Sequence, residues 1–144
     1  MKVLIILFAS LLLSCSQTSN KEISVLLVYS SENVENFESV KKGYESVLEE
    51  EGVPYRWEHF ISLLQSDPKE MVKSTPALIF PDKLSQFLHS DLSGWVQEYV
   101  NYGGNVLAAF DSGTKDKNLN FIDKAVFSEN TGFNYVLYNE LENG

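Results

Sequence analysis

Residues 77–110, ALIFPDKLSQFLHSDLSGWVQEYVNYGGNVLAAF, contain a complete strand–helix–strand unit. Two short apolar runs at its ends, residues 77–80 and 105–110, are typical of strands buried on both faces of a sheet. Between them, apolar side chains recur at the spacings of an amphipathic helix: Leu92, Trp95, Val96, Tyr99 and Val100. Because two parallel strands need a helix-length crossover, the segment predicts one βαβ unit.

Polar and glycine residues mark the limits of this helix. Ser90 or Asp91 can cap its start, and Gly103-Gly104 can end it. Before it, residues 84–88 predict one or two helical turns.

The same alternation of strand and helix precedes this unit. Residues 23–29, ISVLLVY, predict a buried strand, and residues 53–61 alternate as a strand near the sheet edge does. The helix between them has Ser30 or Ser31 as its expected cap and Gly52 as its expected end. Its apolar stripe consists of Val34, Phe37, Val40, Tyr44, Val47 and Leu48.

A further helix begins at Asp67-Pro68, where an acidic cap precedes proline at the first helical position, and it ends before Pro76. Strand and helix therefore alternate four times. This pattern predicts a three-layer, doubly wound α/β domain of the flavodoxin-like kind, with a mostly parallel sheet of four to five strands.

The predicted domain spans residues 23–144, and its last strand falls at residues 133–138, FNYVLY. No helix is predicted after this strand, although a doubly wound sheet normally covers its last strand. We therefore expect either a trimmed member of a larger family or a truncated gene product.

The first fifteen residues, MKVLIILFASLLLSC, predict export. A basic start and an apolar run of roughly 7–15 residues define a secretory signal, and this run is too short to span a bilayer. Leu12-Leu13-Ser14-Cys15 resembles the bacterial lipobox, which implies a signal peptide over residues 1–14 and a lipid chain on Cys15. Residues 15–22 then hold the lipidated cysteine and a flexible tether. The alternative is an ordinary signal in which Cys15 is incidental.

The charge of the chain limits its partners. It carries 20 acidic and 11 basic side chains, and removal of residues 1–14 takes away Lys2 and no acid. Nucleic-acid binding and docking on anionic lipid both need clustered Lys and Arg, so neither is expected. The expected contact with the membrane is the lipid anchor alone.

Three segments resemble the class I glutamine-amidotransferase-like group, which includes non-catalytic domains of some β-galactosidases. They are PALIFPD, YVNYGG and NVLAAFDSGT, within a match that covers about residues 25–114. Catalytic members of the group place a cysteine on the turn after the last of these strands, backed by a downstream histidine. Here that turn reads Phe110-Asp111-Ser112-Gly113, and no histidine follows His89. The resemblance therefore implies a domain without the group's catalysis, because Ser112 would need a base to replace the nucleophile.

Ligands of parallel sheets bind beyond the carboxyl ends of the strands. Those ends predict a small acidic rim of Ser30, Ser31, Asp82, Asp111, Ser112 and Gly113. Either this rim holds a sugar or a cation, or its side chains cap loops, which is the favoured interpretation. His59 and His89 have no metal-ligand spacing and are expected to pack or cap, so the sequence predicts no metal and no cofactor.

Two functions remain. The first is a lipid-anchored accessory or interaction domain of the bacterial cell envelope, with an envelope protein or a carbohydrate as partner. Ser16 after the cysteine resembles the sorting pattern of outer-membrane lipoproteins, which implies the periplasmic side of the outer membrane. The second is the N-terminal fragment of a larger exported carbohydrate-active or amide-hydrolysing enzyme.

Overall fold

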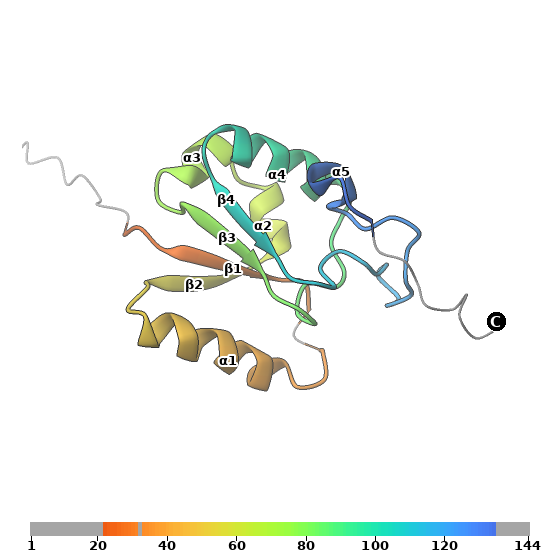
Figure 1. The fold of residues 1–144 in the computed structure, drawn as a ribbon, viewed down its shortest axis with the longest axis horizontal. Helices are drawn as coiled ribbons and strands as arrows, with labels where there is room; N and C mark the ends of the chain where they lie inside the picture. The colour runs from red at the N-terminus through yellow and green to blue at the C-terminus, as the bar shows by residue number, and fades with distance from the viewer. Residues whose placement is uncertain (1–21, 32, 135–144) are drawn as a thin grey trace, which may run out of the picture.

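The computed structural model describes residues 22–31 and 33–134. Four strands form one all-parallel sheet in the order β2-β1-β3-β4, as Figure 1 shows. They are β1 (Val25–Tyr29), β2 (Tyr55–His59), β3 (Ala77–Phe80) and β4 (Asn105–Ala108). The predicted parallel α/β sheet is therefore confirmed, with the predicted edge position of β2.

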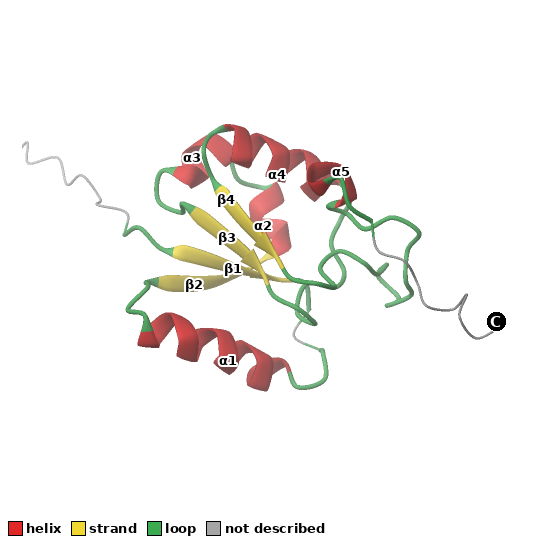
Figure 2. Cartoon of the chain, in the orientation of Figure 1, coloured by secondary structure: helices red, strands yellow, loops and turns green. Residues whose placement is uncertain are grey.

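Helices lie on both faces of the sheet, as the doubly wound prediction requires (Figure 2). On one face lies α1 (Phe37–Glu50), which connects β1 to β2. The other face carries α2 (Phe60–Leu64), α3 (Pro68–Val72) and α4 (Asp91–Asn101). The short helix α5 (Ser128–Thr131) follows β4 and lies beside α4.

The main hydrophobic core lies between the sheet and α4. Its centre is Tyr99, whose side chain is fully buried and whose ring stacks on Trp95 at a centroid distance of 5.4 Å. The Tyr99 hydroxyl donates a hydrogen bond of 2.6 Å to the backbone oxygen of Thr75, just before β3. The other members of this cluster are Leu26, Val28, Phe60, Leu63, Met71, Leu78, Phe80, Leu88, Leu92, Val96 and Phe127.

The face that carries α1 is only partly covered. Strand register places Trp57, Leu27, Ile79 and Leu107 side by side across this face, in the order of the strands. Leu27 is fully buried, Ile79 is half-buried and Leu107 is 59% exposed. Burial therefore declines from β1 to β4, and the α1 side of β3 and β4 forms an uncovered apolar surface.

Several predicted boundaries and caps were wrong. The helix expected from Val34 begins at Phe37, and neither Ser30 nor Ser31 caps it. Ser90 does stand at the N-cap of α4, but its side chain makes no capping hydrogen bond; the His89 ring accepts the Asp91 N–H at 3.3 Å. The strand expected over residues 53–61 ends at His59, since Phe60 and Leu63 bury their side chains from a helical turn.

Other local predictions were confirmed. Asp67 caps α3 by accepting the Lys69 N–H at 2.8 Å, with Pro68 as the first helical residue. Gly52 follows α1 with a φ of +66°.

A further prediction was wrong. The helical turns expected at residues 84–88 do not form: residues 84 and 85 belong to a hydrogen-bonded turn, and Phe87 forms an isolated bridge to Lys115. Of the strand predicted at residues 133–138, Phe133 and Asn134 belong to no strand and the remainder lies outside the described residues.

We predict that Gly104→Ala lowers the free energy of unfolding by about 2 kcal/mol, because overpacking a filled core has costs of this order. A Cβ at residue 104 would lie 2.1 Å from the Tyr99 ring, which is buried and has no room to move. Urea unfolding followed by circular dichroism measures the change. Gly43→Ala is the matched control. A Cβ at residue 43 meets nothing within 4 Å, so this substitution inside α1 is expected to raise the free energy of unfolding by roughly 0.5–1 kcal/mol. Equal stability of the two variants would contradict the packing argument.

Candidate functional site

The loops after β1, β3 and β4 meet at the carboxyl ends of the strands, where the sequence predicted a rim. Hydrogen bonds join these loops to one another. The Ser30 N–H and hydroxyl both donate to the Leu84 backbone oxygen, at 2.8 and 3.0 Å. The Gly113 N–H donates to the Ser85 backbone oxygen at 2.8 Å. Within the part of the chain that the structure describes, the Ser31 hydroxyl makes a local contact, accepting the Asn33 N–H at 3.1 Å.

The Asp111 carboxylate holds the loop after β3. It accepts the Lys83 N–H at 2.9 Å and the Gln86 side-chain amide at 2.6 Å. Lys83 has a φ of 61°, a left-handed conformation that is uncommon for a residue other than glycine. The carboxylate therefore stabilises a turn that the chain alone disfavours.

Asp82 forms the second carboxylate contact of the rim. The Tyr44 hydroxyl on α1 donates to Asp82 Oδ1 at 2.8 Å. Burial, together with the hydrogen bond to this carboxylate, raises the pKa of Tyr44 to about 12. Tyr44 therefore stays protonated at neutral pH, and its hydroxyl joins α1 to the loop after β3.

Ser112 lies in the turn that follows β4, where the resemblance noted in the sequence would expect a nucleophile. Its side chain is buried, and its hydroxyl donates to the Phe80 backbone oxygen at 2.8 Å. It also lies 3.2 Å from the Ser85 hydroxyl, which bonds the Pro81 backbone oxygen. Gly113 continues the turn with a φ of +68°. Among the described residues, the Ser112 hydroxyl therefore contacts a backbone carbonyl and another hydroxyl, and neither group can act as a base.

Both histidine rings form hydrogen bonds to backbone groups. The His59 ring bonds the Ser30 backbone oxygen at 2.9 Å through Nε2 and accepts the Ile61 N–H at 3.3 Å through Nδ1. His89 caps α4 through the contact with Asp91 described above. The predicted packing and capping roles match these contacts.

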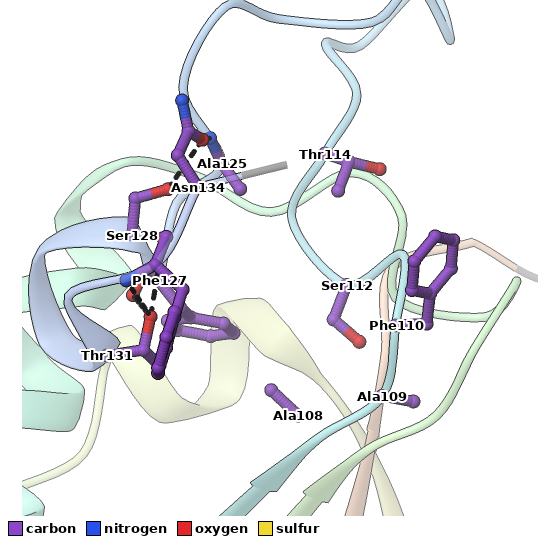
Figure 3. Close-up of a pocket in the computed structure, with 11 residues that line it drawn as sticks. Ala108, Ala109, Phe110, Ser112, Thr114, Ala125, Phe127, Ser128, Thr131 and Asn134 are labelled. Carbon is purple, nitrogen blue, oxygen red and sulfur yellow. Dashed lines mark hydrogen bonds between the residues drawn. The ribbon is translucent and has the colours of Figure 1, made fainter. Parts of the chain in front are cut away.

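A hollow of about 320 Å³ lies beside the rim, at the carboxyl end of β4 (Figure 3). Its lining is mostly apolar, with Ala108, Phe127 and Phe133 among its members, and Ser112 and Asn134 contribute polar groups. Phe110 and Phe133 are 92% and 80% exposed, so two aromatic rings border the hollow and face solvent. Exposed rings beside a concavity are typical of binding surfaces.

This hollow could not be predicted from sequence because α5 supplies much of it. Phe127, Ser128 and Thr131 come from the start and end of this helix, whose single turn shows no hydrophobic periodicity. The Asn134 side chain fixes the segment by accepting from Ser128 at 2.9 Å and donating to the Asp123 backbone oxygen at 3.0 Å. The usable signal was the pair of phenylalanines at positions 110 and 133 beside turn residues.

Cys15, the predicted lipidation site, lies outside the described residues. Within residues 22–31 and 33–134, no group of three or more His, Cys, Asp or Glu side chains is placed to hold a metal ion. No helix in this described part has the length and apolar character needed to cross a membrane.

Comparison with known proteins gives the fold but no family. No protein-family model matches the chain, and no curated protein matches it in sequence. The fold is similar to that of a solved β-galactosidase from Bifidobacterium adolescentis, with a TM-score of 0.59 and 12% sequence identity. The similarity covers 82% of this chain and 57% of that chain, so the match spans less than two thirds of the β-galactosidase.

We predict that Ser112→Ala lowers the free energy of unfolding by about 0.5–1.5 kcal/mol, because it removes one of two hydrogen bonds to the buried Phe80 carbonyl, which keeps the Ala109 N–H at 2.9 Å. Thermal and urea unfolding measure the change. Ser31→Ala is the control, since its hydroxyl makes only a local turn contact and its loss is expected to change stability by less than about 0.5 kcal/mol. A Ser112→Ala protein as stable as the parent would show that this hydroxyl does not fix the turn.

Proposed function

We propose that the chain is a lipid-anchored, extracytoplasmic interaction domain without catalysis of its own. The observation that carries this proposal is that the Ser112 hydroxyl is buried and bonds the Phe80 carbonyl. The resemblance noted in the sequence would expect the group's nucleophile at this turn. Ser30 and Asp111 likewise bond to backbone groups of neighbouring loops. The polar groups of the rim thus stabilise the fold. We infer that a partner binds to the surfaces around the rim instead.

The exposed aromatic rings support a binding role. Phe110 and Phe133 border a mostly apolar hollow, a surface that suits an envelope protein or the flat face of a carbohydrate. The acidic charge of the chain, net −9, supports neither nucleic acid nor an anionic membrane surface as partner.

The anchor is proposed from the lipobox-like segment that ends at Cys15. Signal peptidase would cut before this cysteine, and the sulfur would carry the lipid. Each buried methylene of an acyl chain contributes roughly 0.8 kcal/mol of membrane affinity, so several chains give a durable attachment. Ser16 at the next position supports sorting to the outer membrane.

We predict that Cys15→Ala abolishes lipid attachment and moves the protein out of the membrane fraction. The full-length chain is expressed in a Gram-negative host with radiolabelled palmitate, and membranes are separated on a density gradient. The parent protein is expected to carry label, to begin at residue 15 by mass spectrometry and to lie in the outer membrane. Ser16→Ala is the control and should keep the label. A parent protein recovered unlabelled with its initiator methionine would refute the anchor.

A second candidate function is the N-terminal part of a larger exported carbohydrate-active or amide-hydrolysing enzyme. The similarity in fold to a β-galactosidase favours it, because the match covers only 57% of that chain. The enzymatic activity would then reside in another part of the larger protein.

The genomic DNA beyond codon 144 separates the two candidates. For an interaction domain we predict a stop codon followed by a transcription terminator. An open frame that continues in phase, or resumes after one frameshift, would favour the fragment instead.

A further inference from the structure

A second hollow, which we call the α1 groove, lies between α1 and the uncovered surface of β3 and β4. Its volume is about 400 Å³. Val40, Gly43 and Val47 line it from the helix, and Ile79 and Leu107 line it from the strands. Val47 and Leu107 are 60% and 59% exposed, so this apolar lining faces solvent.

The dimensions of the sheet indicate what the groove fits. Neighbouring strands lie about 4.8 Å apart, so four strands span about 14 Å between the outer axes. Helices pack at about 8–10 Å, so such a face has room for two helices side by side. Among the described residues α1 is alone on its face, and it lies toward β2, where Glu45 accepts the Trp57 N–H at 3.0 Å. The space left over β3 and β4 is therefore one helix wide.

The surface of α1 that borders the groove permits close approach. A Cβ added at Gly43 would meet nothing within 4 Å, which leaves the helix backbone accessible there. Glycine inside a helix costs about 1 kcal/mol relative to alanine, so this open position lowers the stability of the domain itself. Ser39, one turn earlier on the same stripe, is also small and exposed.

Acidic groups flank both ends of the groove. Glu50 and Glu51 stand at the C-terminal end of α1, where the helix dipole is also negative and the last turn holds no basic residue. Glu49 is directed toward β2, where it accepts the Tyr55 hydroxyl at 2.8 Å. Asp82 lies toward the other end, bonded to Tyr44 of the lining. Lys41 is directed away, over the Trp57 ring on the β2 side. An occupant with basic residues at its two ends therefore complements the groove.

A second copy of the chain is a poor occupant on the same evidence. Its own α1 would bring Glu49, Glu50 and Glu51 to a surface that already carries acidic groups at both ends. Like charges brought together in this way oppose association.

We propose that the α1 groove binds one amphipathic helix of a protein partner, with an apolar face of about three turns and Lys or Arg at both ends. This inference rests on the proposed interaction function and names its partner class. The lining of α1 runs from Ser39 to Leu48, a length of about 14 Å at 1.5 Å per residue. The apolar side chains supply affinity, and the charged ends set the position of the bound helix.

The test uses the protein made from the full-length gene, recovered from whichever fraction holds it and reconstituted in zwitterionic nanodiscs when that fraction is the membrane. The probe is a fluorescein-labelled helical peptide with a leucine stripe and lysines at both ends, and fluorescence anisotropy gives Kd. Gly43→Leu, which fills the groove, is expected to weaken binding about tenfold or more. Gly94→Leu is the matched control on α4, because a Cβ there also meets nothing within 4 Å.

Charge is tested in the same assay. The double variant Glu50→Gln, Glu51→Gln is expected to weaken binding and to reduce its salt dependence. Glu49→Gln is the matched control, because Glu49 bonds Tyr55 on the β2 side of the helix. A peptide with glutamates in place of the lysines is expected to bind at least about tenfold more weakly than the lysine peptide.

Three results would overturn the inference. They are equal binding by the Gly43→Leu and Gly94→Leu variants, equal binding of the two peptides, and a parent protein that sediments as a dimer while Gly43→Leu sediments as a monomer. Circular dichroism confirms that each variant folds. Failure of palmitate labelling leaves this assay unaffected. The proposed lipid anchor and the proposed helix-binding groove are therefore tested independently.

Discussion

The packing of Tyr99 beneath Gly104 holds together the parts of this fold that are distant in sequence. The Tyr99 ring fills the space that a side chain at residue 104 would need, and its hydroxyl bonds the Thr75 carbonyl before β3. One turn earlier on α4, the Trp95 N–H donates to the Ser66 carbonyl between α2 and α3, at 3.0 Å. One helix face therefore fixes β3, β4 and the crossover that precedes them, and the main core lies on its side of the sheet.

Because that core lies on one face, the other face is free to expose apolar surface. Burial contributes roughly 25 cal/mol per Å² of apolar area, and the α4 side buries Leu26, Leu78 and Phe80 completely. On the α1 side, Leu27 is as deeply buried, but Leu107 at the end of the same row is mostly exposed. A partner that covered β3 and β4 would complete the helical layer on this face, where the described residues supply α1 alone.

Much of the fold could be predicted from sequence because its strands and long helices carry strong local patterns. The run from Val25 to Tyr29 and the stripe that includes Trp95 and Tyr99 each specify one element. The caps could not be predicted, since Ser30 bonds the distant Leu84 carbonyl instead of a helix end. The α1 groove could not be predicted from sequence either. The exposure of Leu107 depends on the order of the strands in the sheet, which the sequence of one strand does not encode.

The turn at Ser112 differs physically from a turn that presents a catalytic nucleophile. A turn that presents a nucleophile must leave its hydroxyl or thiol exposed beside a base, whereas Ser112 is buried and donates to the Phe80 carbonyl. Under the proposed interaction function, recognition depends on the surfaces around the rim, and a lipid on Cys15 would change the affinity that they require. An anchored domain and an envelope partner share a thin layer, so their effective concentration is high without further contacts. For such an anchored pair, a short apolar groove with acidic ends would need less intrinsic affinity to hold its partner at the membrane.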